Sequence, residues 1–284
     1  MVAQPTPHNE AILALLQILV LAAVQGITEF LPISSQAHLI MVDEFASWPD
    51  AGLEIRIAVH VGSLGAVILY FRRDIWAVIK GLFQLLLGRS SDGARLGIHL
   101  FIAAVPVIGA GAALVLLDLT DALQSPAVIA WTMLVFGILL WFADRVGMTV
   151  RRIEHMTGGS ALIIGVAQIL ALIPGTSRAG ITMTAARLMG YERTEASRFS
   201  ILLALPVILA AGGWDAFSIY RGGNWQLGID AILAAVVAFA VAYGAIVFLM
   251  KWLETATFTP FVIYRVIVGG ALLIWIYWGP GSVT

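Results

Sequence analysis

Two short stretches of this sequence place polar and ionisable side chains at a break in an otherwise apolar segment. Residues 25–38 read QGITEFLPISSQAH, and residues 173–182 read IPGTSRAGIT. Each stretch has a proline, neighbouring hydroxyl residues and an ionisable side chain, and each follows a run of apolar residues. An ionisable group in apolar surroundings is costly and needs a partner or a function. Both breaks are therefore candidate functional sites.

The first break contains a candidate cation site. Gln25 and Glu29 are four residues apart and share one face of a helix, where their oxygens could together hold a divalent cation. Ser34 and Ser35 follow the proline, and His38 is suited to transfer a proton or to stabilise charge on a group in transfer. The alternative for Glu29 is a purely structural ion pair with an arginine of the second break.

The second break contains a candidate anion site. Arg178 presents a planar fork of donors that suits a phosphate or a carboxylate. Glycines let the backbone approach a ligand, and hydroxyl residues lie where the free N–H groups and the dipole of a new helix favour an anion. The residues concerned are Gly175, Thr176, Ser177, Gly180 and Thr182. Together they indicate a phosphate group; the alternative is a capped turn, with Thr176 or Ser177 as the N-cap.

The composition determines which elements can position these residues. The chain has 284 residues, 60% of them hydrophobic and 12% charged, far from the usual composition of soluble domains. A bilayer core of ~30 Å needs ~20 helical residues for each crossing, so the sequence predicts an all-α integral membrane protein. The apolar runs are continuous, which excludes a transmembrane β-barrel.

Charge and cysteine usage exclude several further classes of function. The net charge is −1 and no Lys/Arg-rich patch stands apart from the loops, which argues against nucleic acid as a partner. The chain has no cysteine, so disulfides, thiolate catalysis and Cys-ligated zinc are excluded. The first 55 residues contain no Lys or Arg, so we expect no cleavable signal peptide.

Hydropathy predicts six membrane-spanning helices. They cover roughly residues 55–71, 98–117, 127–143, 199–213, 229–250 and 261–279. Two further apolar segments, 11–31 and 161–173, run into the two breaks and continue as short helices to about residues 46 and 190. We expect each to form a re-entrant helical hairpin, which enters the membrane and turns back.

The distribution of basic residues predicts the orientation. With both termini outside, the outer segments contain one basic residue, Arg221, whereas the inner segments contain twelve besides Arg178. This asymmetry follows the positive-inside rule. We therefore expect a multi-pass protein of the bacterial inner membrane with both termini outside.

The two breaks also indicate an internal repeat. LPISSQA (31–37) aligns without a gap with IPGTSRA (173–179), at an offset of 142, half of the chain length. The repeats would cover about residues 1–142 and 143–284, each with one hairpin and three crossings. Three is odd, so the halves should be inverted, and the two breaks can then meet near the middle of the membrane.

The motifs closely resemble the two signatures of the bacterial undecaprenyl-diphosphate phosphatase family, also known as the bacitracin-resistance family. Gln25 and Glu29 match the first signature, Glu or Gln, three residues, then Glu. The second, Pro-Gly-x-Ser-Arg-Ser-x-x-Thr, is matched by Pro174, Gly175, Ser177, Arg178 and Thr182. The similarity extends over the whole chain, including HVGSLGAVILYFRRD (60–74). Two departures are Ala179, where the family usually has Ser, and Gln25, where Glu is commoner.

The resemblance implies a membrane phosphatase. The substrate would be undecaprenyl diphosphate, hydrolysed to the monophosphate and inorganic phosphate, which recycles the carrier lipid for peptidoglycan synthesis and is linked to bacitracin resistance. It also implies Mg²⁺ or Ca²⁺ as cofactor and often a homodimer. The residues carried over from the family are Gln25, Glu29, Ser34, Ser35, His38, Ser177, Arg178 and Thr182.

Gln25 and Glu29 would hold the metal ion. We expect the catalytic residues to be Glu29, Ser35, His38, Ser177 and Arg178, and the substrate-binding residues to be Ser34, Gly175, Thr176, Gly180 and Thr182. The nucleophile would be a serine, either Ser177 or Ser35, or a metal-bound water.

Two other functions are compatible with parts of the pattern. Inverted repeats with paired hairpins are typical of secondary transporters, a class that would include a lipid-phosphate flippase. A carrier, however, needs no nucleophile, whereas the two breaks together carry hydroxyl groups, an arginine, a histidine and an acid. A structural membrane subunit would give no reason for ionisable residues at both breaks.

Overall fold

The computed structural model describes residues 7–46, 48, 52–117, 125–147, 149–222 and 228–279. Apart from an isolated parallel bridge between Arg151 and Tyr191, the secondary structure of this part of the chain is helical. The helices are α1 (Pro7–Thr28), α2 (Ser35–Ala46), α3 (Leu53–Tyr70), α4 (Arg72–Leu86), α5 (Asp92–Leu116), α6 (Pro126–Val146), α7 (Gly158–Gln168), α8 (Arg178–Leu188), α9 (Arg193–Gly222), α10 (Ile229–Thr255) and α11 (Thr259–Trp278), with short 3₁₀ turns η2 (Ile153–His155) and η3 (Ile169–Leu172).

Six of the described helices are long and apolar enough to cross a membrane. They are α3, α5, α6, α9, α10 and α11, which confirms the six predicted spans. Two of them begin about six residues earlier than hydropathy predicts, α5 at Asp92 and α9 at Arg193. The first turn of each contains charged residues, so hydropathy does not detect it. In α5 the side chain of Ser91 caps this turn by accepting a hydrogen bond from the backbone N–H of Ala94.

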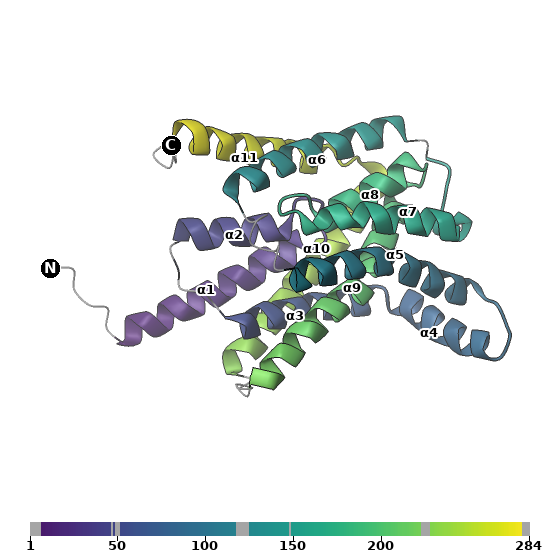
Figure 1. Cartoon of the computed structure of the whole chain (residues 1–284), viewed down its shortest axis with the longest axis horizontal. Coiled ribbons are helices and arrows are strands. Elements are labelled where there is room, and N and C mark those ends of the chain that lie inside the picture. Colours follow the sequence, from purple (N-terminus) through teal and green to yellow (C-terminus); the bar gives the residue numbers. More distant parts are fainter. Residues whose placement is uncertain are drawn as a thin grey trace.

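The two apolar segments that precede the breaks form the first arms of helical hairpins. The chain runs through α1, breaks at residues 29–34 and returns through α2; it runs through α7 and η3, breaks at residues 173–177 and returns through α8. In Figure 1, α1 and α2 lie toward one end of the long axis and α7 and α8 toward the other. Both hairpins therefore direct their breaks toward the interior of the molecule.

The helix contacts of the two halves correspond. Helix α1 packs on α10 as α7 packs on α5, and α3 packs on α10 as α9 packs on α5. Glycines permit the close approach in both halves: a Cβ at Gly62 of α3 would collide with the backbone of Ala235 in α10, and one at Gly165 of α7 with the backbone of Ala103 in α5. This correspondence is the arrangement that two copies of one helical unit would give.

Helix α4 was not predicted from the sequence, which we interpreted as an inner connection over residues 72–97. The helix lies beside the start of α5 and extends away from the hairpins (Figure 1). Its apolar side chains Trp76, Ile79, Phe83 and Leu86 recur at intervals of three and four residues and are exposed. The charged residues Arg72, Arg73, Asp74 and Lys80 lower the mean hydropathy of this 15-residue helix, so hydropathy alone does not identify it.

The orientation prediction depends largely on segments outside the described residues. The terminal residues 1–6 and 280–284 and much of the expected outer loops, residues 118–124 and 223–227, are among them. The expected inner residues that the structure describes include Arg145, Arg151 and Arg152, which lie where α6 ends and before α7 begins.

Candidate active site

Two serines with a left-handed backbone begin the return helices of the hairpins. Ser34 has φ 74° and Ser177 has φ 73°, and they are the non-glycine residues with positive φ in the described part of the chain. The Ser34 hydroxyl accepts a hydrogen bond from the N–H of Ala37 at 3.4 Å, and the Ser177 hydroxyl accepts one from the N–H of Gly180 at 3.0 Å. Each serine is thus an N-cap, three residues before its donor.

This geometry changes the register between the two breaks. The ungapped sequence match pairs Ser34 with Thr176, whereas the backbone and the caps pair Ser34 with Ser177. The second break has one more residue between its proline and its cap, because Gly175 and Thr176 occupy the interval that Ile33 alone occupies in the first. The capping role predicted for Ser177 is present in the structure and leaves its hydroxyl proton free to be donated.

Two helix N-termini therefore stand at the breaks. The first N–H groups of any helix lack partners within that helix, and a cap satisfies only part of them. In α2 and α8 the capping serine takes the third of these groups, which leaves those of Ser35 and Gln36 and of Arg178 and Ala179 without an intrahelical acceptor. Such ends bind anions through their N–H groups and their dipole.

An ion pair joins the two breaks. Arg178 Nη2 donates to Glu29 Oε1 at 3.0 Å, and Arg178 Nη1 donates to the carbonyl oxygen of Ser200 in α9 at 3.1 Å. The side chains of Arg178 and Glu29 are 14% and 8% exposed, so the pair is largely shielded from solvent. Residues 149 positions apart in the sequence are thereby in contact, as the convergence of the two hairpins requires.

The Glu29 carboxylate accepts two further hydrogen bonds, both on Oε2. Gln25 donates through Nε2 at 2.9 Å, and Ser35 donates through its hydroxyl at 2.8 Å. The oxygen of the same Gln25 amide, Oε1, is buried without a hydrogen-bond partner in the described structure, and so is the hydroxyl of Thr176. Buried polar atoms without partners are rare and indicate a missing ligand, ion or water.

The side chains near Glu29 fit a divalent cation that shares its ligands with a substrate. No group of three or more His, Cys, Asp or Glu residues gathers anywhere in the described ranges, so Gln25 and Glu29 would supply the oxygens. Mg²⁺ is commonly held by one or two carboxylates together with phosphate oxygens and water, and Ca²⁺ accepts amide oxygens as well. The orphaned Gln25 Oε1 is an oxygen of this kind.

His38 lies one turn into α2 and has a partner on each ring nitrogen. Nδ1 is 2.7 Å from the carbonyl oxygen of Ser34, and Nε2 is 2.6 Å from the hydroxyl of Tyr264 in α11. The two rings also stack, with their centroids 5.5 Å apart. A carbonyl only accepts, so Nδ1 carries the proton in this arrangement and Nε2 accepts from Tyr264. Tyr264 thus orients the histidine, although it was not predicted as a site residue from the sequence.

Arg265, which was not predicted as a site residue from the sequence, is completely buried and contacts both breaks. Its guanidinium donates to the carbonyl oxygen of Pro32 in the first break and to those of Gly175 and Thr176 in the second. It also donates to two carbonyl oxygens of α6, at residues 132 and 133. All of these acceptors are neutral, so among the described residues no carboxylate is paired with this guanidinium. The available signal was an arginine inside a predicted span, which is a functional candidate by default.

The remaining predicted residues lie around this centre. Gly175 has φ 88°, and a Cβ there would collide with Thr132 and Ile129 of α6, so the turn needs glycine for its backbone and for its packing. A Cβ at Gly180 would lie 2.9 Å from Arg265 Nη1. The Thr182 hydroxyl donates to the Arg178 carbonyl at 2.8 Å and is 2.7 Å from the Ser200 hydroxyl. Its substrate contact stays a prediction.

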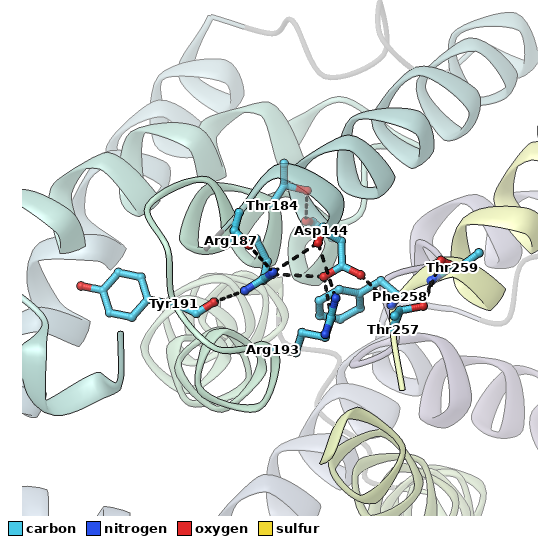
Figure 2. Close-up of polar contacts among 10 residues, drawn as sticks. Asp144, Thr184, Arg187, Tyr191, Arg193, Thr257, Phe258 and Thr259 are labelled. Carbon is cyan, nitrogen blue, oxygen red and sulfur yellow. Dashed lines mark hydrogen bonds and ion pairs between the residues drawn. The ribbon is translucent and has the colours of Figure 1, made fainter. Parts of the chain in front are cut away.

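A second buried ionic cluster lies at the far end of α8 (Figure 2). Asp144 accepts hydrogen bonds from Arg187 Nε at 3.1 Å, from Arg193 Nε at 2.7 Å and from the N–H of Phe258 at 3.2 Å. Arg187 donates its remaining hydrogen bonds to the carbonyl oxygens of Asp144, Gly147 and Tyr191. The cluster joins the end of α6, the end of α8, the start of α9 and the connection between α10 and α11.

Comparison with known proteins gives concordant matches over nearly the whole chain. A relative from Dinoroseobacter shibae, named undecaprenyl-diphosphatase, is 47% identical over 93% of this chain and 100% of its own length. One from Rhodospirillum rubrum, named undecaprenyl-diphosphatase 1, is 47% identical over 94% of this chain and 96% of its own. A third, from Roseobacter denitrificans and named undecaprenyl-diphosphatase, is 45% identical over 93% and 100%.

The family comparison covers both breaks and all six spans except the end of the last. The model of the family described as bacitracin resistance protein BacA matches residues 18–271. This range includes the polar and ionisable residues at the two breaks, Gln25, Glu29, His38, Arg178 and Arg265. With the helices, the converging breaks and these matches together, the chain belongs to the bacitracin resistance protein BacA family.

Proposed function

We propose that this chain is a membrane phosphatase that hydrolyses undecaprenyl diphosphate to the monophosphate and inorganic phosphate. The observation that carries the proposal is the contact between Glu29 and Arg178, an acid suited to a cation and a guanidinium suited to a phosphate, between two helix N-termini. The names of the relatives support hydrolysis over transport by a carrier or flippase. The product would re-enter cell-envelope synthesis as a carrier lipid.

The diphosphate would replace part of the contact between the breaks. Arg178 would turn its fork from Glu29 to the terminal phosphate, whose oxygens would also accept from the free N–H groups of α8. Gln25 and Glu29 would hold a divalent cation, Mg²⁺ or Ca²⁺, which when bound neutralises charge on the phosphate oxygens. Charge stabilisation and positioning are the main requirements of phosphoryl transfer, and this arrangement supplies both.

Attack on the terminal phosphorus needs a hydroxyl group, from a serine or from water. Ser35 already donates to a carboxylate, Glu29, which is the pairing that activates a nucleophile. Ser177 is instead occupied as the cap of α8, although its proton is free. We therefore favour Ser35 over Ser177. As the bond from phosphorus to the bridging oxygen breaks, the electrons pass to that oxygen and the lipid monophosphate leaves, while the Ser35 proton would pass to Glu29. His38, once its ring has taken up a second proton on Nε2, would supply the proton that neutralises the leaving oxygen. A water would then cleave the phosphoserine, which restores Ser35 and releases inorganic phosphate.

We further propose that both hairpins are re-entrant and belong to an inverted repeat of residues 1–142 and 143–284, in the bacterial inner membrane with both termini outside. The corresponding helix contacts of the two halves support the repeat, and the excess of basic residues in the predicted inner segments supports the orientation. A homodimer is proposed from the family resemblance alone.

The decisive experiment measures phosphate release by the purified protein in detergent. Undecaprenyl diphosphate is supplied with Mg²⁺ or Ca²⁺, and a matched sample receives EDTA. We expect release in the metal-replete samples and its loss with EDTA. No phosphate release in the metal-replete samples would overturn the enzyme proposal. Release unaffected by EDTA would overturn the proposed dependence on a divalent cation. A phosphoenzyme trapped by rapid acid quenching in the wild type, and absent in Ser35→Ala, would establish Ser35 as the nucleophile.

A further inference from the structure

An apolar groove of about 520 Å³ runs between α5, η3 and α9. Its walls carry large apolar side chains, among them Val107 and Leu114 of α5 and Val207 of α9. Its floor includes small residues, Gly111 of α5 and Ala211 of α9, which leave the space open. The composition of the walls suits a hydrocarbon chain rather than a polar ligand.

One end of the groove reaches the two breaks. Gln36 lines it and directly follows Ser35, whose hydroxyl donates to Glu29. Pro174 lines it as well and directly precedes Gly175, the turn residue of the second break. Gln36 and Pro174 thus bring the lining of the groove next to the residues of the breaks, and the other lining residues belong to α5, η3 and α9.

We propose that this groove holds the first isoprene units of the substrate's prenyl chain while the diphosphate lies at the breaks. This assignment rests on the proposed function. A carbon takes up about as much room as a water molecule, so a five-carbon unit needs about 150 Å³ and the groove accommodates about three to four units. The remaining units of an undecaprenyl chain would extend into the lipid.

The groove would act by positioning and not by attracting the chain out of the membrane. Lipid tails are as apolar as the groove walls, so the transfer between them carries little hydrophobic free energy. A chain fixed at its first units, however, fixes the phosphorus relative to Arg178 and to the attacking hydroxyl. We therefore expect kcat/KM to increase with the number of isoprene units until the groove is filled.

Helix α5 offers a matched pair of variants. Gly111 lines the groove, and a Cβ there would make ordinary van der Waals contact with Leu172 at 3.6 Å, so a leucine would fit and fill the space. Gly109 lies two residues earlier on the same helix, is exposed, has open space around it and does not line the groove. Gly111→Leu should therefore block the groove, whereas Gly109→Leu makes the same substitution on the same helix and leaves the groove open.

The test measures kcat/KM in detergent for prenyl diphosphates of one to eleven units. For the wild type we expect kcat/KM to rise up to about the fourth unit and then to level off. For Gly111→Leu we expect a loss of about tenfold with the four-unit substrate and less than twofold with the one-unit substrate. Gly109→Leu should match the wild type with both. Ala211→Leu is a second blocking variant should Gly111→Leu fail to fold.

A second readout does not depend on turnover. A four-unit diphosphate with a photoreactive diazirine on its last unit should label residues 107–116 or 207–214 of the wild type, and Gly111→Leu should reduce this labelling. Equal kcat/KM for all chain lengths, equal effects of the two glycine variants, or labelling elsewhere would overturn the groove while leaving the phosphatase intact. Absence of release from every substrate would overturn the proposed function itself and the groove with it.

Discussion

The two buried ionic clusters of this protein differ in how completely they are hydrogen bonded. In the first, Glu29 pairs with Arg178 beside the orphaned oxygens of Gln25 and Thr176. In the second, both oxygens of Asp144 are used, by two arginines and a backbone N–H, and both terminal nitrogens of Arg187 donate to carbonyl oxygens. The hydroxyl of Tyr191 lacks a partner, but Figure 2 shows it directed away from Asp144.

This difference separates a binding site from a structural link. A closed network has no capacity left for a ligand, and breaking it leaves a charge buried without compensation. An incompletely bonded network contains buried polar atoms without hydrogen-bond partners. Their burial costs free energy unless a ligand supplies the missing hydrogen bonds. Substitutions in the first cluster should therefore change catalysis, and those in the second should change stability.

The largest effect is expected for Arg178→Ala. Loss of the fork that binds the transferred phosphate should lower kcat/KM by about a thousandfold, as arginine removal does in other phosphoryl transfers. The variant should remain extractable and monodisperse, because Glu29 keeps the hydrogen bonds from Gln25 and Ser35. Phosphate release and size-exclusion profiles measure the two outcomes. Arg178→Lys serves as the control, since it retains the positive charge without the planar fork of donors. Its kcat/KM should lie between those of the wild type and Arg178→Ala. Near-normal turnover in Arg178→Ala would remove the phosphate-binding assignment.

A somewhat smaller effect, on stability instead of rate, is expected for Asp144→Asn. The change leaves Arg187 and Arg193 without a counter-charge and should cost about 3 kcal/mol of unfolding free energy. Thermal unfolding in detergent measures it, with turnover per folded molecule expected within about twofold of the wild type, since Asp144 lies in the structural cluster.

Asp92→Asn is the matched exposed substitution for the Asp144 experiment. Asp92 pairs with Arg95 at the surface, and its side chain is 84% exposed. The expected loss is at most about 1 kcal/mol. If the two aspartate variants unfolded alike, or if Asp144→Asn selectively lowered kcat, the contrast between the clusters would be wrong.

The smallest effect is expected for Gln25→Glu, which restores the carboxylate that is commoner in the family. A second negative charge beside Glu29 should lower the Mg²⁺ concentration for half-maximal activity by about tenfold, since oxygen sites bind more tightly as ligand charge increases. Without metal the two carboxylates repel each other, and the apo variant should be less stable than the wild type. An unchanged metal titration would exclude residue 25 from the cation site.

The sequence predicted the elements of this fold better than their junctions. The six spans could be predicted because a continuous apolar run is enough by itself to indicate a membrane-spanning helix. Glu29 and Arg178 could be identified because an ionisable side chain in an apolar segment needs a partner. Helix α4 was not predicted because it is short and four of its residues are charged, which lowers its mean hydropathy. The pairing of Ser34 with Ser177 depends on two backbone angles that residue identity does not reveal.

The site residues that were missed depend on contacts between distant segments. Tyr264 and Arg265 lie in α11, more than 200 positions from the residues of the first break that they contact. Within its own segment each looks like a residue of an apolar span, Tyr264 as an interfacial aromatic and Arg265 as an isolated charge. Only the packing of α11 against α6 and both hairpins gives them partners.

The position of Arg265 has a consequence for assembly of the protein. Helix α11 follows the other described helices in the chain, and a guanidinium inside a membrane-spanning helix is costly, by about 2.5–3.5 kcal/mol at the helix centre. Its compensating carbonyls come from residues 32, 132, 133, 175 and 176, so they are together only after both halves have associated. Burial of Arg265 in α11 is therefore compensated only once both breaks and α6 are in place, which links the association of these segments to the formation of the site.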